Sequence, residues 1–280
     1  MDQLVDVFLS ALRMATPLWF AAMGGLLSER SGVINLGLEG YMLIGAFAAA
    51  SVAHFSGMAW LGLAAGGMAG AWLAVVFAVL VLELKGDQVV LGMGINLFAV
   101  GLTPFLCKMF FDVTGSTPSL APAERFSYEL ILVALAVVGI LAFWYRSLLS
   151  GLWLQFAGEE PFALTASGIS VKRLRWVFLL SSGCLAGLGG ASLSIMLASQ
   201  FTRLMTAGNG FIAIAALILG ACYHPFVSKR GSPSRPSSMP FIARSPFPLY
   251  RTSSLVSSSV STGPEGVRTA TCRRSTCRWI

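Results

Sequence analysis

Long apolar stretches alternate with short polar turns along this chain. The stretches lie at about residues 5–27, 34–53, 58–84, 89–111, 129–145, 176–198 and 211–222. A helix needs about 20 apolar residues to cross the hydrocarbon core of a bilayer, and only the seventh stretch is clearly too short. Because the apolar residues are continuous rather than alternating, a transmembrane barrel is excluded. The pattern therefore predicts an all-α polytopic transmembrane helix bundle with six full spans and a truncated seventh.

The composition agrees with a membrane protein. The chain is 56% hydrophobic and 11% charged, whereas soluble domains carry roughly 25% charged residues. The net charge of +7 is confined to the C-terminal end, because residues 1–222 hold ten basic and eleven acidic side chains. We expect no nucleic-acid partner. Residues 1–225 are predicted to form the transmembrane domain, and residues 226–280 a basic Ser/Pro/Arg-rich tail that is disordered.

Basic residues in the short loops predict the orientation of the chain. Arg30, Lys85, Arg146 and the basic loop at 172–175 fall on one side of the bundle if the spans alternate. Since cytoplasmic loops carry the excess of Lys and Arg, that side is predicted to be cytoplasmic and the N-terminus to lie outside.

Sequence motifs for enzyme chemistry are missing. The chain contains no phosphate-binding GxxxxGK[ST] loop, so it cannot hydrolyse ATP alone, and it contains neither HExxH nor GxSxG. Its two histidines are not paired, and the cysteines in the apolar stretches are expected to be small packing residues. We therefore predict that the chain is not an enzyme and binds no metal or cofactor itself.

Four polar residues stand within or beside the predicted spans: Arg13, Asn35, Glu39 and Asn96. Such residues are expensive in lipid and are candidates for a translocation path by default. Glu39 could line the path, pair with Arg13, or stabilise the positive end of a helix. Asn96 could instead make hydrogen bonds between helices.

Small residues recur at the spacing used for close helix packing. Gly62, Gly66 and Gly70 form one stripe, and Gly183 and Gly187 repeat the spacing. Such stripes allow helix backbones to approach in lipid, and lining of a translocation path is the alternative.

The polar connection between the fifth and sixth spans contains a short predicted helix at residues 158–169. Pro161 suits the first helical position, Glu159 and Glu160 complement the helix dipole, and Gly168 suits the C-terminal cap. A short capped helix between two spans can lie on the membrane face and dock into a soluble partner.

Several ordered motifs carry a resemblance to a known family. They occupy residues 27–40 (LSERSGVINLGLEG), 86–90, 96–103, 158–169 and 205–216. The chain resembles, over residues 5–225, the permeases of ATP-binding-cassette importers for nucleosides and simple sugars, relatives of the branched-chain amino-acid permeases. By that resemblance the protein is expected in the bacterial plasma (inner) membrane, where it would translocate its solute by alternating access.

The resemblance also implies the partners. They are a second permease subunit, two ATPase subunits that bind ATP and Mg²⁺, an extracellular substrate-binding lipoprotein and the lipid bilayer. The 158–169 segment would be the coupling helix that fits a cleft of the ATPase. The residues that match the family pattern are Gly158, Glu159, Pro161, Ala163, Ala166, Gly168 and Ile169. The family usually has Asn before the proline and charged residues where Phe162 and Thr165 stand.

Two other functions are weighed against the importer. A stand-alone secondary transporter or channel would use Glu39 and Arg13 in an ion path. The chain could also be an inactive truncated permease. The resemblance stops after Tyr223–His224–Pro225. We hypothesise that the residues beyond are out of frame or otherwise foreign and that at least one span is lost, which resequencing of the locus would test.

Overall fold

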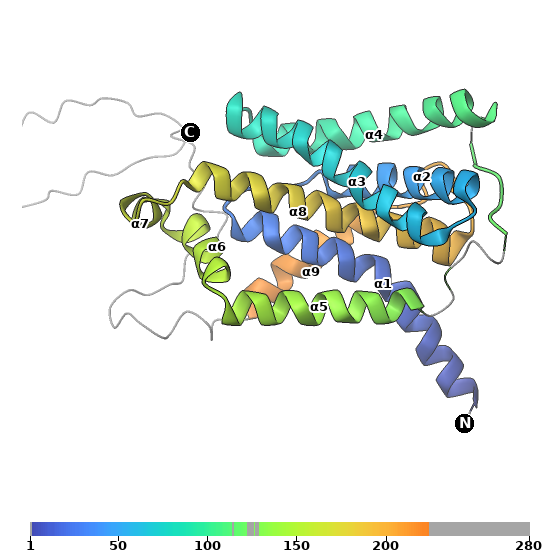
Figure 1. Ribbon diagram of the computed structural model, residues 1–280, viewed down its shortest axis with the longest axis horizontal. Helices are drawn as coiled ribbons and strands as arrows, with labels where there is room; N and C mark the ends of the chain where they lie inside the picture. Colours follow the sequence, from blue (N-terminus) through green and yellow to red (C-terminus); the bar gives the residue numbers. More distant parts are fainter. Residues whose placement is uncertain (1, 114, 122–125, 127–128, 224–280) are drawn as a thin grey trace, which may run out of the picture. The chain divides into compact units, whose positions relative to one another are not determined.

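The computed structural model describes residues 2–113, 115–121, 126 and 129–223, and all of these lie in the first of two units, residues 1–229. Its α-helices are α1 (Asp2–Arg30), α2 (Leu38–Ser56), α3 (Ala59–Ala78), α4 (Gln88–Phe111), α5 (Glu129–Ser147), α6 (Leu149–Glu159), α7 (Pro161–Ala166), α8 (Val171–Ser192) and α9 (Asn209–Tyr223) (Figure 1). Helices α3 and α8 continue as π-helical turns, Val79–Glu83 and Leu193–Ala198.

Six helical segments of the described part are long and apolar enough to cross a membrane, which confirms the predicted number of full spans. They are α1, α2, α4, α5, and α3 and α8 with their π-helical extensions. The seventh apolar helix, α9, has only 15 residues. The tail predicted to be disordered (226–280), its boundary at 225 and the His224–Pro225 turn lie outside the described residues.

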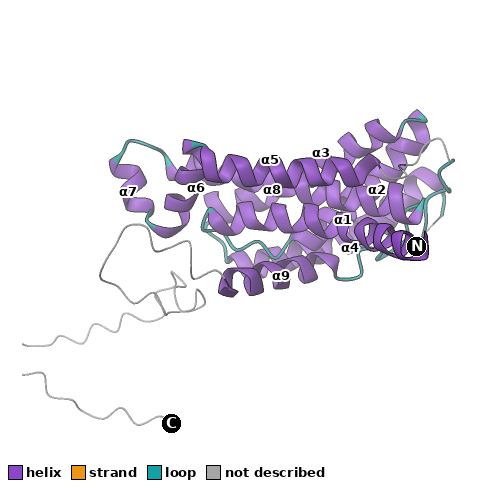
Figure 2. Ribbon diagram, turned by 90° about the horizontal axis from the view of Figure 1, so that it is seen from below, coloured by secondary structure: helices purple, strands orange, loops and turns teal. Residues whose placement is uncertain are grey.

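Helices α2, α3 and α8 lie side by side in the bundle (Figure 2), and glycine residues form the contacts between them. A Cβ atom on Gly66 would lie 2.9 Å from the carbonyl oxygen of Gly45 in α2, and one on Gly70 would lie 2.7 Å from the Cα of Gly187 in α8. Neither distance leaves room for a side chain. The glycine stripes are therefore packing surfaces that bring three backbones into contact where lipid offers no hydrophobic drive.

The remaining spans surround this core. Helix α1 packs on α8, α9 and α5 pack on α1, and α4 packs on α2. The outer faces of α4 and α5 expose large apolar side chains such as Leu97, Phe105, Leu132 and Ile140. A surface of that kind is stable where hydrocarbon is the solvent.

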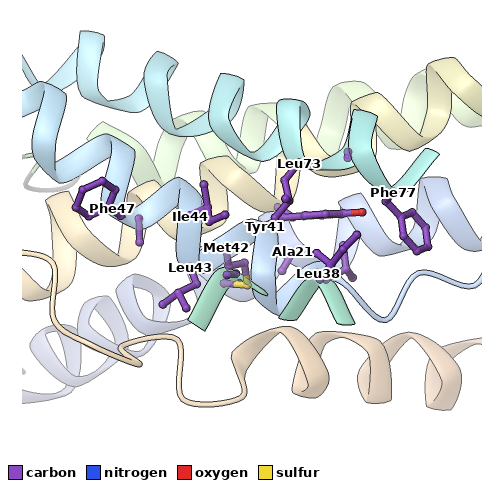
Figure 3. Close-up of a cluster of buried hydrophobic side chains, with 14 of the residues drawn as sticks. Ala21, Leu38, Tyr41, Met42, Leu43, Ile44, Phe47, Leu73 and Phe77 are labelled. Carbon is purple, nitrogen blue, oxygen red and sulfur yellow. The ribbon is translucent and has the colours of Figure 1, made fainter. Parts of the chain in front are cut away.

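The largest cluster of buried side chains is centred on α2. Figure 3 shows the ring of Tyr41 lying among Leu73 and Phe77 of α3 and Leu38 of its own helix. Because α2 is buried over most of its length, its start is held firmly inside the bundle. This start carries Glu39 and is bonded to Asn96 of α4 through the Gly40 amide.

The basic loops gather at one end of the bundle. Lys172 makes a 2.7 Å ion pair with Glu83, and the Arg30 guanidinium lies 5.9 Å from the ring centre of Tyr145. The opposite end is tied by the bond from the Thr117 amide to the Phe201 carbonyl, at 3.0 Å. The predicted grouping of basic loops is confirmed, and the assignment of that end to the cytoplasm stays a prediction.

Candidate functional site

The last residues of α1 and the first of the connection to α2, residues 28–33, form a tightly bonded turn at the end of the bundle where the basic loops gather. The Ser28 hydroxyl donates to the Val33 carbonyl at 2.9 Å, and the Ser31 hydroxyl donates to the Ser28 carbonyl at 2.6 Å. Both serines are fully buried. Gly32 has a φ of +83°, a left-handed conformation that glycine adopts without steric cost. This α1–α2 turn is thus held by its own hydrogen bonds.

The backbone after the turn runs in irregular form to the first residue of α2. The Ile34 amide donates to Oε1 of Gln88 at 2.8 Å, and Oδ1 of Asn35 accepts from the Gly37 amide at 3.0 Å. Irregular backbone within a membrane protein is tolerated only where protein or water satisfies its polar groups. Side chains from α4 and from the segment itself do so here.

Asn96 of α4 joins this segment to the start of α2. Its Nδ2 donates to the Leu36 carbonyl at 2.9 Å, and its Oδ1 accepts from the Gly40 amide at 2.8 Å. The side chain is buried, and both ends of its amide are used. These contacts are those of the hydrogen-bonding alternative raised for Asn96.

Glu39 bonds to the beginning of α9. Its Oε1 accepts from the Gly208 amide at 2.9 Å and its Oε2 from the Gly210 amide at 2.7 Å. The carboxylate therefore stabilises the positive end of a helix 170 residues away in sequence, which adds charge–dipole attraction to two charge-assisted hydrogen bonds. We call Asn35, Glu39 and Asn96 the polar junction, because the segment from 35 to 40 brings their contacts together.

The suggested pairing of Glu39 with Arg13 is wrong. Arg13 instead donates from Nη2 to the carbonyl of Met196, which belongs to the π-helical end of α8. The last carbonyl groups of a helix have no partner within the helix, and the guanidinium bonds to one of them. Arg13 Nε is buried with no hydrogen-bond partner among the described residues. Arg13 is therefore separate from the polar junction.

The 158–169 segment differs from the single helix that was predicted. Helix α6 ends at Glu159, so Gly158 and Glu159 belong to that helix, and α7 begins at Pro161. Glu160 between them has φ −139° and ψ 72°, because the ring of a following proline disfavours helical backbone. Sequence reasoning placed Pro161 correctly but overlooked α6.

The end of α7 confirms the predicted glycine cap. Gly168 has a φ of +80°, its amide donates to the Thr165 carbonyl at 3.0 Å, and the Ile169 amide donates to the Leu164 carbonyl at 3.1 Å. These two bonds form a Schellman motif, which satisfies carbonyl groups at the end of the helix. Ala163 and Ala166 lie inside α7. The motif fixes the direction in which the chain leaves toward α8.

The last turn of α6 lies directly on the α1–α2 turn. A Cβ on Gly158 would stand 2.5 Å from the Arg30 carbonyl oxygen, so the two backbones touch. Arg175 of α8 binds both segments: its Nε donates to the Ser31 carbonyl at 3.1 Å and its Nη2 to the Ala157 carbonyl at 3.3 Å. One guanidinium thus joins α8, α6 and the α1–α2 turn.

Sequence reasoning missed Arg175, Gly208 and Gly210. Arg175 was used only to orient the chain, because a basic residue in a loop normally indicates sidedness rather than a contact. Gly208 and Gly210 lie in a Gly-Asn-Gly sequence at the start of α9. That pattern indicates an exposed group of backbone N–H donors but not the carboxylate that meets them. Within the described residues no cluster of His, Cys, Asp or Glu is arranged to hold a metal ion.

The chain matches a known protein family and several known proteins. Residues 7–234 match the family described as branched-chain amino acid transport system, permease component. The guanosine ABC transporter permease NupQ of Bacillus subtilis is 35% identical over 250 residues, covering 80% of this chain and 77% of the relative. No solved structure matches the chain.

Two further relatives differ in the solute that they are named for. The nucleoside ABC transporter permease NupC of Lactococcus lactis is 34% identical over 74% of this chain and 72% of its own length. The putative glucose ABC transporter permease TsgC13 of Haloferax volcanii is 35% identical over 75% of this chain and 68% of its own length.

Proposed function

The chain belongs to the family of permease components of branched-chain amino-acid transport systems, and we propose that it translocates a nucleoside or a simple sugar as the membrane-spanning subunit of an ATP-driven importer. It is a multi-pass protein of the plasma membrane and a transporter subunit, not an enzyme. The solute class is taken from the names of the three relatives described above, which are named for guanosine, for nucleosides and, as a putative permease, for glucose.

The observation that carries the proposal is the exposed face of α7. Phe162 is 83% exposed, whereas Leu164, two residues later, is 3% exposed and anchors the helix to the bundle. The helix lies between α6 and α8, at the end where the basic loops gather. Aromatic side chains, Phe among them, are enriched at the cores of protein interfaces. Helix α7 is therefore suited to dock into a soluble ATPase subunit.

The proposed mechanism is alternating access. The importer would contain a second permease subunit, two ATPase subunits and an extracellular substrate-binding lipoprotein. ATP and Mg²⁺ would bind to the ATPase subunits, and this chain would hold neither. Closure of the ATPase dimer would press on the 158–169 segment, and the spans would then open toward the other side of the membrane. The ATPase would shift the equilibrium between the two conformations of the permease because it binds one of them more tightly.

The test is uptake into proteoliposomes that contain the permease, the proposed second permease subunit and the proposed ATPase subunits, with the binding protein supplied outside. Labelled guanosine and labelled glucose serve as probes. We expect uptake of one of the two probes to require ATP on the side of the membrane that carries the ATPase subunits. Uptake that follows a proton gradient and ignores ATPase loss would show a secondary transporter, and failure of every partner to co-purify would show an inactive permease.

A variant tests the docking face itself. Phe162→Ala should lower co-purification of the ATPase at least fivefold, because an interface loses its exposed aromatic anchor. Phe143→Ala is the matched control, since Phe143 is 67% exposed but lies within α5 among the lipid-facing positions. Equal ATPase recovery from the two variants would exclude α7 as the docking helix.

A further inference from the structure

Near its start, the 158–169 segment is fastened to the transmembrane part of the chain at a small joint. The joint consists of the Arg175 guanidinium, the carbonyl groups of Ser31 and Ala157, and the contact between Gly158 and the Arg30 carbonyl. Ser31 and Ala157 are fully buried. A planar guanidinium can bridge two carbonyl groups with separate N–H donors, which the point charge of lysine does less well.

The α1–α2 turn and the segment after it form a braced arm that leads from this joint into the bundle. The turn is closed by the Ser28 and Ser31 hydroxyl groups. The segment beyond it is held by Gln88 and then by Asn96. Since successive parts of the arm are tied to themselves or to α4, the arm moves more readily as one piece than by bending.

The far end of the arm lies on α9. Glu39 directly precedes Gly40, whose amide Asn96 holds, and its carboxylate binds the amides of Gly208 and Gly210. A Cβ on Gly210 would lie 2.7 Å from the Glu39 amide nitrogen, so the start of α9 also touches the arm through its backbone. A displacement at the joint would therefore reach both α2 and α9.

We propose that Arg175 is a positioning residue that clamps the 158–169 segment to this arm, so that force from the soluble partner moves the polar junction and α9 together. The inference rests on the proposed function. Arg175 would act through the backbone of its two partners, Ser31 and Ala157, without contact to ATP or solute. Loss of the clamp would leave ATPase docking at α7 intact but would disconnect ATP hydrolysis from movement of the spans.

The experiment compares Arg175→Ala, Arg175→Lys and Arg173→Ala in the complete importer in proteoliposomes, with guanosine and glucose as probes. Arg173 is exposed on the same turn of α8 and supplies the matched loss of charge. We expect Arg175→Ala to retain at least half of the bound ATPase and of the ATP hydrolysis while solute taken up per ATP falls at least tenfold. Arg175→Lys should recover part of that ratio, and Arg173→Ala should match the wild type.

A second variant keeps Arg175 and its charge but pushes α6 away from the α1–α2 turn. Gly158→Ala places a methyl group against the Arg30 carbonyl and should lower uptake per ATP like Arg175→Ala, whereas Gly139→Ala, whose methyl group meets open space, should not. Normal uptake per ATP in Arg175→Ala or in Gly158→Ala would overturn the proposal, as would loss of ATPase binding in step with uptake. If the wild-type importer shows no ATP-dependent uptake, it is the proposed function that fails.

Discussion

Removal of the Glu39 carboxylate should release the start of α9. In Glu39→Ala the amides of Gly208 and Gly210 lose their acceptors, which stand at 2.9 and 2.7 Å. An unsatisfied buried donor costs about 1–3 kcal/mol, and loss of the charge–dipole attraction costs about 0.3–1 kcal/mol more. Two donors are lost, but the site is only half-buried and water can partly satisfy them. We therefore expect the start of α9 to lose about 2–4 kcal/mol of local stability in total. At about 1.4 kcal/mol for each factor of ten, local opening should increase about 30- to 700-fold.

Hydrogen exchange of the peptide that contains residues 208–212, measured on the permease in lipid nanodiscs, reports this opening directly, because exchange of a bonded amide follows local unfolding. Glu39→Gln keeps one acceptor and should lose about half of the stabilisation. Glu39→Asp keeps the charge but is one methylene shorter, so it cannot reach both amides. Its exchange rate should lie between those of Glu39→Ala and Glu39→Gln.

Glu129→Gln is the control for this series. Glu129 also lies in the first turn of a helix, α5, but its side chain is exposed. Its replacement should leave exchange at 208–212 unchanged. Exchange in Glu39→Ala within twofold of the wild-type rate would refute the reasoning, since the two bonds would then contribute nothing to the stability of α9.

Two further substitutions test the packing and the cap. Gly187→Ala directs a methyl group at the Gly66 backbone, with the Cα of Gly70 3.0 Å away, and should separate α3 from α8; the midpoint of thermal unfolding in detergent should fall by several degrees, whereas an unchanged midpoint would contradict the packing role. Gly168→Pro cannot adopt the φ of +80° and should abolish stimulation of the partner ATPase, while carbonate extraction still finds the chain in the membrane; unchanged stimulation would refute the coupling assignment.

The sequence identified polar residues of the candidate site but not their partners. Glu39 and Asn96 could be singled out because polar groups in apolar stretches are costly wherever they lie. Their partners could not be found, since Glu39 meets Gly208 and Gly210, and no spacing rule connects positions so far apart. The proposed pair with Arg13 failed for the same reason: opposite charge suggests a partner, but only the packing of α1 on α8 decides that Arg13 reaches Met196 instead.

The 158–169 segment likewise has features that the sequence predicted and a contact that it did not. Pro161 and Gly168 act through the backbone conformations that their own chemistry imposes, so the start and the cap of α7 were predictable. Arg175 acts through two carbonyl groups on other segments, and nothing in its neighbours along the chain marks that role.

The amino-acid sequence by itself determined the membrane class, the six spans, the glycine stripes and the cap of α7, because each depends on local hydrophobicity or local backbone conformation. Tertiary structure decided which helices the glycines join, where Glu39 and Arg13 bind, and that Arg175 fastens α6 to the α1–α2 turn. These are contacts between distant residues, and in lipid, where hydrophobicity does not choose helix partners, only the complementary fit of packed backbones and hydrogen-bonding groups selects them.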